Sequence, residues 1–208
     1  FLVRILEKKP SRLGKLCDEH LCGNSSLSFR VPGWLRNQMP SAWEDENRRA
    51  TAASLIGEIG PKAVAAIGPL ITTLEAQEER KKLSNEAYMA QRLQSEVFTA
   101  LKSMGEQGVI ALPKYLNYLE SDDDEWRATG AELVGSIGPK AKVAVPLLLE
   151  AMGRTNEWLR FSAAVALWKV DFQTNTALAV FATELSSKSG YNRIWSLRYL
   201  SEMGLSAR

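Results

Sequence analysis

The chain has little of what many enzymes and metal proteins need. Its 208 residues include one histidine, His20, and two cysteines, Cys17 and Cys22. A single histidine excludes iron centres built from several His-Glu pairs, and a histidine-dependent triad would have to use His20, beside cysteines of no special placement. The sequence also lacks a Gly-x-x-x-x-Gly-Lys-Ser/Thr phosphate-binding loop. We therefore predict that the chain is not an enzyme and takes no cofactor.

The two cysteines and the histidine form the one group that suggests a metal, with Asp18 between them. Structural zinc usually takes four ligands in two spaced pairs, and the sequence has no second pair. A disulfide is disfavoured as well, because side chains five residues apart on one helix point in different directions. We predict two ordinary thiols and no metal.

The sequence also lacks an excess of charge of one sign and a long apolar run. Lys and Arg number 26 against 24 Asp and Glu, a balance that disfavours a surface dedicated to nucleic acid or membranes. No run reaches the roughly 18 to 20 apolar residues that cross a bilayer, and no stretch has the pattern of a secretory signal. The chain as given is expected to be soluble, with its compartment open. A membrane tether is expected only through a segment upstream of Phe1.

What the chain has instead is an internal repeat. Residues 55–63 (LIGEIGPKA) return as residues 133–141 (LVGSIGPKA). The small residue that ends each first helix serves as a marker and gives five copies, at Gly60, Gly105, Gly138, Asp171 and Gly204. The spacings are 45, 33, 33 and 33 residues. Such a period predicts a stacked array, which builds long surfaces rather than enclosed pockets.

Each copy predicts two helices joined by a turn. Apolar residues stand one and four positions before the marker in all five copies, which is the stripe of an amphipathic helix. Gly-Pro at the marker predicts a left-handed C-cap followed by a proline that begins the next helix. Pro113 and Pro146 stand eight residues past their markers, so we expect a bent or late-starting second helix. Ser121 and Thr155 are predicted to mark two helix N-termini.

These patterns predict an all-α fold, a right-handed α-solenoid (an α-α superhelix) of about 4.5 helical hairpins. Residues 1–40 form a basic N-terminal arm and residues 41–208 form the array. The predicted hairpins are residues 41–76, 84–119, 121–152, 155–187 and, incompletely, 190–208. In the arm, residues 11–21 are either a helix that caps the first hairpin or, with an anchor upstream, a segment that lies beside a membrane.

The repeat resembles the HEAT-like repeats of bacterial proteins, most closely the short version in phycobilisome-lyase-type repeat proteins. The likeness covers about residues 41–208 and rests on the 33-residue unit, an early arginine, the Gly-Pro-Lys-Ala turn and the proline of the second helix. It implies an armadillo-like helical fold whose second helices line a concave face that binds protein. Asp171 departs from the marker glycine, and Gln94 replaces the arginine. The first interval between markers is longer than the others, and the additional residues fall around residues 75–84. We expect them to form either an extended, solvated helix end or a partner site.

One arginine column runs through the array, at Arg49, Arg127, Arg160 and Arg193. A row of guanidinium groups spaced one repeat apart suits a run of phosphates. HEAT-like repeats, however, commonly pair this arginine with an acceptor of the neighbouring repeat, and acids stand nearby at Glu46, Asp124 and Glu157. We favour the second interpretation, a structural ladder between repeats.

The resemblance and the missing catalytic groups together predict a non-catalytic scaffold that binds a protein or peptide on its concave face. The predicted partner-binding residues are Lys114, Asn117, Tyr118, Leu147 and Glu150. The alternative is a nucleic-acid-binding HEAT-like protein related to alkylpurine DNA glycosylases, with Trp126 and Asp124 as its base-stacking and acidic residues. The predicted concave row has no positive stripe, so nucleic acid is disfavoured. The sequence does not identify the partner.

Overall fold

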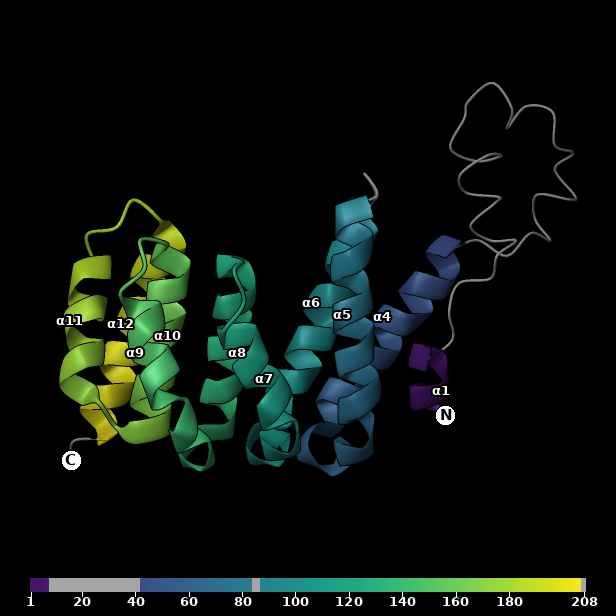
Figure 1. Ribbon diagram of the computed structural model, residues 1–208, viewed down its shortest axis with the longest axis horizontal. Coiled ribbons are helices and arrows are strands. Elements are labelled where there is room, and N and C mark those ends of the chain that lie inside the picture. Colours follow the sequence, from purple (N-terminus) through teal and green to yellow (C-terminus); the bar gives the residue numbers. More distant parts are fainter. Residues whose placement is uncertain (8–41, 84–86, 207–208) are drawn as a thin grey trace, which may run out of the picture. The chain divides into compact units, whose positions relative to one another are not determined.

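The computed structural model of the chain describes residues 1–7, 42–83 and 87–206 (Figure 1). All regular secondary structure in these ranges is helical, which confirms the all-α part of the prediction. The chain divides into two compact units, an N-terminal unit (Phe1–Ser103) and a C-terminal unit (Met104–Arg208). The predicted cap helix of residues 11–21, and Cys17, His20 and Cys22, lie outside the described residues.

The N-terminal unit packs its helices around α6. It contains α1 (Leu2–Glu7), α4 (Ala42–Ile59), the 3-10 turn η3 (Gly60–Ala66), α5 (Ile67–Leu83) and α6 (Ala87–Ser103). α6 packs against α4 and α5, and the short α1 packs against the same two helices. The largest buried aliphatic side chains of this unit are Leu6, Ile56, Ile67, Leu70, Leu74, Leu93 and Leu101. α5 continues to Leu83, so residues 75–83 of the long first interval are helical.

The chain reverses direction between α4 and α5. Arg49 on α4 donates a hydrogen bond of 3.4 Å to the hydroxyl of Thr73 on α5, although 24 residues separate them. A straight helix would place these residues about 36 Å apart, so the chain must fold back. The sequence analysis did not anticipate that Glu46–Ala76 is long and apolar enough to cross a membrane by length and composition. The reversal makes this stretch two helices of a hairpin rather than one straight span.

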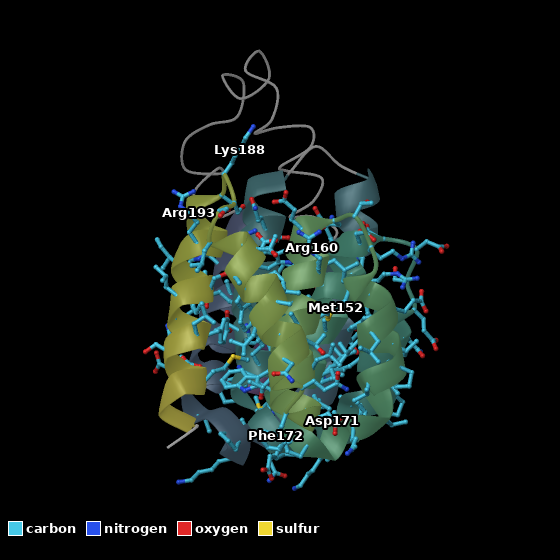
Figure 2. The ribbon with its side chains drawn as sticks, turned by 90° about the vertical axis from the view of Figure 1, so that its left-hand side faces the viewer. Met152, Arg160, Asp171, Phe172, Lys188 and Arg193 are labelled. Atoms are coloured by element: carbon cyan, nitrogen blue, oxygen red, sulfur yellow. The ribbon has the colours of Figure 1, made fainter. Side chains whose placement is uncertain are left out.

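The C-terminal unit holds hairpins that follow one another along the chain (Figure 2). Its elements are η4 (Gly105–Ala111), α7 (Leu112–Leu119), α8 (Asp124–Ile137), η5 (Gly138–Ala144), α9 (Val145–Met152), α10 (Glu157–Asp171), α11 (Thr174–Glu184) and α12 (Gly190–Ser206). α8 packs on α7 and α10, α10 packs on α9 and α11, and α11 packs on α12. Each of these contacts joins helices that are adjacent or next but one in the chain.

The predicted turn chemistry is confirmed. Gly60, Gly105 and Gly138 all have positive φ, between 53° and 72°, in the left-handed region that a Cβ disfavours. A 3-10 segment follows each of them, and the second helix begins only afterwards, with Pro113 and Pro146 in the first turns of α7 and α9. Proline is tolerated there because the first N–H groups of a helix have no partner within the helix.

Two predicted helix N-termini are wrong by one or two residues. Asp123, not Ser121, caps α8, with its carboxylate accepting from Glu125 N–H at 2.7 Å. Asn156, not Thr155, caps α10 and accepts from Leu159 N–H at 3.0 Å. Asp and Asn are as good N-cap residues as Ser and Thr. Both loops contain more than one such residue in a row, so the sequence alone does not define which of them caps the helix.

The last two markers also differ from the prediction. α10 includes Asp171, and the left-handed residue is Phe172, with φ of 52°. Gly204 does not end its helix, because α12 continues to Ser206. A non-glycine residue with positive φ is uncommon and strained. Phe172 is in the left-handed α conformation, with φ of 52° and ψ of 32°, whereas Gly138 has φ of 72° and ψ of −145°, so the chain leaves α10 and α8 by different turns.

The first helices of successive hairpins cross closely where small residues meet. A Cβ placed on Gly57 of α4 would lie 3.6 Å from Cβ of Ala100 on α6, and one on Gly135 of α8 would lie 3.2 Å from Cβ of Ala166 on α10. Both pairs join the residue three before one marker to the residue five before the next. The same packing register therefore occurs once within each compact unit.

Candidate interaction surfaces

The structure places all five predicted partner-binding residues on two neighbouring helices, and four of them reach the surface. Lys114 and Asn117 are exposed on α7, and Glu150 is exposed and Leu147 half-buried on α9. Lys114 and Leu147 both stand nine residues past a marker, and Asn117 and Glu150 both stand twelve past. α7 and α9 are in contact. These four residues are called the second-helix face below.

Tyr118 is the member of the predicted set that lies in the core. It is 8 % exposed, and its ring centroid lies 4.8 Å from that of Trp126 and 6.4 Å from that of Tyr115. A helix turns about 100° per residue, so the residue after Asn117 points toward α8 rather than toward solvent. Tyr118 therefore supports the face by packing α7 against α8. Its direct contact with a partner is not supported by this burial.

Glu150 is held in place by two arginines. One of its carboxylate oxygens, Oε1, lies 3.2 Å from Arg127 and 3.4 Å from Arg154. The Arg127 side chain is almost fully buried, whereas that of Glu150 is 55 % exposed. Exposed ion pairs add little stability, about 0 to 1 kcal/mol. The effect of this pair is to fix the position of a carboxylate at the surface.

The arginine column ties helices within a hairpin, where the sequence analysis expected bonds between hairpins. Arg127 on α8 pairs with Glu150 on α9, 23 residues away, and Arg160 on α10 pairs with Glu184 on α11 at 2.8 Å, 24 residues away. The bond from Arg49 to Thr73 has the same spacing. The reason is geometric: the chain reverses after the first helix, so the start of that helix lies beside the end of the second.

The same arginines also hold the loops that precede their helices. Arg127 donates from Nε to the carbonyl of Ser121. Arg193 donates to the carbonyls of Ser187 at 2.7 Å and Lys188 at 3.1 Å. In both cases an acceptor lies six residues earlier. The guanidinium groups are thus bonded to protein acceptors, which disfavours the interpretation that they follow a row of phosphates.

The C-terminal unit contains a buried carboxylate that sequence reasoning missed. Glu184 is 2 % exposed. One oxygen accepts from Arg160 at 2.8 Å and the other from the Asn192 amide at 2.8 Å. The Glu184 carboxylate therefore joins α10, α11 and α12. Loss of either partner would leave a buried oxygen without its hydrogen bond, which is costly. The sequence does contain an indication of Glu184: it is an acidic residue that stands 24 positions after Arg160, a member of the arginine column.

Ionic contacts between successive hairpins do exist, but they lie on the turns. Lys140 on η5 pairs with Glu106 on η4 at 2.9 Å. Lys142 on η5 pairs with Asp171 at the end of α10 at 2.6 Å. The hydrogen bond from Lys142, followed by one from Gln173, lowers the pKa of the Asp171 carboxyl. The lysines of the turns therefore provide the links that were assigned to the arginines.

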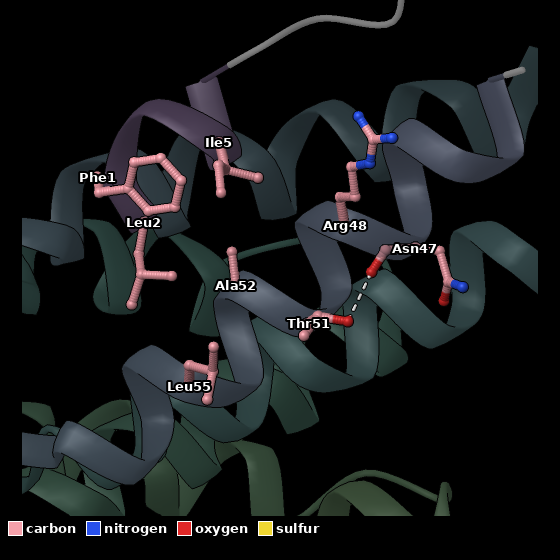
Figure 3. A pocket seen from close by; sticks show the side chains of 8 residues that line it. All are labelled: Phe1, Leu2, Ile5, Asn47, Arg48, Thr51, Ala52 and Leu55. Carbon is pink, nitrogen blue, oxygen red and sulfur yellow. Dashed lines mark hydrogen bonds between the residues drawn. The ribbon is translucent and has the colours of Figure 1, made fainter. Parts of the chain in front are cut away.

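A groove lies between α1 and α4 in the N-terminal unit (Figure 3). Its volume is about 380 Å³, and it is lined by Phe1, Leu2, Ile5, Asn47, Arg48, Thr51, Ala52 and Leu55. Most of the lining is apolar, and the polar members lie toward the start of α4. This groove is called the α1/α4 groove below.

No protein-family model matches the chain, and no curated protein matches it.

Proposed function

We propose that the chain is a non-catalytic interaction module, a right-handed α-solenoid of HEAT-like hairpins that binds a protein or peptide. Support comes from the repeated turn at Gly60, Gly105 and Gly138 and from packing in which each helix contacts near neighbours in the chain. Stacked hairpins of this kind bury a continuous core and leave one row of helices for binding.

The binding surface is the second-helix face. The observation that carries this proposal is that α7 and α9 are in contact and present side chains at the surface in matched repeat positions: Lys114 matches Leu147, and Asn117 matches Glu150. The face combines a cation, an amide, a fixed carboxylate and an aliphatic side chain. Mixed polar and apolar groups with few charges of one sign suit a peptide or a folded protein better than a polyanion.

Two observations weigh against a glycosylase-like function. Trp126 is 7 % exposed, and its ring packs against Tyr118, so it is not presented for stacking on a base. Arg127 and Arg160 are both paired with carboxylates, which reduces the positive field that a nucleic-acid surface needs.

The proposal is tested by capturing a partner at this face and then measuring its affinity. A photoreactive amino acid replaces Asn117 for cross-linking in cell extract, with the same residue at exposed Gln107 of η4 as a positional control. The captured protein is then purified and titrated against the Lys114→Glu and Glu150→Lys variants. The matched controls are Lys62→Glu and Glu58→Lys, which make the same charge changes at exposed positions of the N-terminal unit.

The Lys114 and Glu150 variants are expected to weaken binding about tenfold each, which corresponds to about 1.4 kcal/mol. The two control variants should bind like the unmodified chain. Equal affinity of all four variants would contradict the proposed face. A DNA mobility shift that is sensitive to salt and lost in Trp126→Ala would replace the proposal with the nucleic-acid function.

A further inference from the structure

The outer face of α12 carries exposed apolar side chains. Ile194 is 67 % exposed and Leu197 is 59 % exposed. Ser201 and Gly204 are exposed as well. Because residues three, four and seven apart lie on one side of a helix, these four residues form one stripe. This stripe is called the α12 face below.

The same repeat positions are buried in other first helices. Ile194 and Leu197 stand ten and seven residues before their marker. The residues at these positions in α8 and α10 are at most 4 % exposed: Ala128, Ala131, Phe161 and Ala164. Ser201 corresponds to Gly135, which packs on Ala166 of the next first helix. The α12 face is therefore the side on which a first helix receives the following one.

The α1/α4 groove lies on the opposite side of a first helix, the side that packs on the preceding first helix. Leu55 stands five residues before its marker, as Ala100 and Ala166 do. Those two alanines pack on the preceding first helix, whereas Leu55 is 42 % exposed and lines the groove (Figure 3). Ile59, one turn further, is also exposed. α1 packs on α4, but its six residues leave this part of the face open.

We propose that the chain associates with a second copy of itself, with the α12 face of one copy seated in the α1/α4 groove of the other. Between copies, this contact would repeat the packing that joins α4 to α6 in the N-terminal unit and α8 to α10 in the C-terminal unit. The groove has room for the side chains of Ile194 and Leu197, which are larger than the alanines at those positions in α8.

The charges beside the two faces are compatible with this contact. Arg48 lines the groove, and Glu202 lies next to Ser201 on α12, where Arg198 donates to it at 3.1 Å. Because the two faces differ, the association is heterologous: each bound copy still presents one face, and the assembly grows with concentration.

The test uses two variants of the full chain that each lose one face. Leu55→Glu places a charge in the groove, and Leu197→Glu places one on the α12 face. Sedimentation velocity over a wide concentration range should show that the unmodified chain gains mass with concentration and that each variant alone stays monomeric. An equimolar mixture of the two variants should form a one-to-one dimer and nothing larger, because one intact groove meets one intact α12 face.

Val143→Glu is the matched control, since it changes another exposed aliphatic residue and should associate like the unmodified chain. Circular dichroism checks that each variant is folded, and Thr51→Arg replaces Leu55→Glu if that variant does not fold. Three results would overturn the proposal. The first is an unmodified chain that is monomeric throughout, which means that its own residues or another protein cover these faces. The second is a mixture of the two variants that stays monomeric. The third is association that survives Leu55→Glu, as symmetric pairing of two α12 faces would give.

Discussion

Two contacts between first helices in the C-terminal unit occupy the same repeat position and are built in opposite ways. Between α8 and α10, Gly135 meets Ala166 with almost no side chain between the backbones. Between α10 and α12, the equivalent residues are Trp168 and Tyr199, whose rings meet edge to face at 6.1 Å. The comparison teaches that the hairpin repeat fixes which positions meet. The size of the side chains there sets how closely the helices approach.

The aromatic contact should be the more sensitive to truncation. Tyr199 also packs against Phe161, Phe181 and Trp195, with centroids 5.6 to 6.0 Å apart. Tyr199→Ala removes the centre of this cluster and should lower the free energy of unfolding by about 3 kcal/mol. Urea denaturation followed by circular dichroism gives the value. Tyr199→Phe, which keeps the ring, should lose less than a third as much; equal losses would mean that the hydroxyl, not the ring packing, is responsible.

The small-residue contact should instead be sensitive to added volume. A Cβ on Gly135 would lie 3.1 Å from Cα of Ala166, whereas one on Gly204 in α12 would meet nothing within 4 Å. Gly135→Ala should therefore destabilise by about 1 to 2 kcal/mol, since a backbone has to move. Gly204→Ala should stabilise by about 0.5 kcal/mol through helix propensity. Thermal unfolding of both variants decides the matter, and a stabilised Gly135→Ala would show that α8 and α10 do not cross as closely as described.

The smallest effect on stability is expected at Phe172, where the first helix α10 ends in a residue of positive φ that is not a glycine. Gly138 and Phe172 both have positive φ, but only Phe172 carries a side chain that this backbone conformation strains. Phe172 is also exposed, so its removal loses little packing. Phe172→Gly should raise the free energy of unfolding by a few tenths to about 1 kcal/mol, measured by urea titration against Phe172→Ala, which should not. A loss of stability in the glycine variant would show that the exposed ring packs on something that the account omits.

The sequence could predict the features that depend on residues close together in the chain. Gly60 and Gly138 with their prolines indicated the turns, and Pro146 indicated the late start of α9. Features that depend on the reversal of the chain could not be placed in this way. The partners of Arg127 and Arg160 lie 23 and 24 residues away, on a helix whose position is set by tertiary packing.

The candidate site shows the same division. The register of Lys114, Asn117 and Glu150 follows from the repeat, and these residues are exposed. Tyr118 was predicted to belong to the same surface, but its orientation depends on Gly130 of α8: a Cβ there would lie 3.0 Å from Cβ of Tyr118. Such a close approach of two helices is visible only in the fold.

The most direct test of the account is the register in which successive first helices meet. In a chain with Cys17 and Cys22 replaced by serine, a cysteine pair at positions 57 and 100 should form a disulfide readily, because the Cβ atoms would lie 3.6 Å apart, near the distance of about 3.8 Å that a disulfide needs. A pair at positions 57 and 96, where position 96 lies about one helical turn before position 100 on α6, should not. Mass spectrometry after mild oxidation reads out the result. Efficient cross-linking of the offset pair, with none at 57 and 100, would contradict the proposed packing of the hairpins.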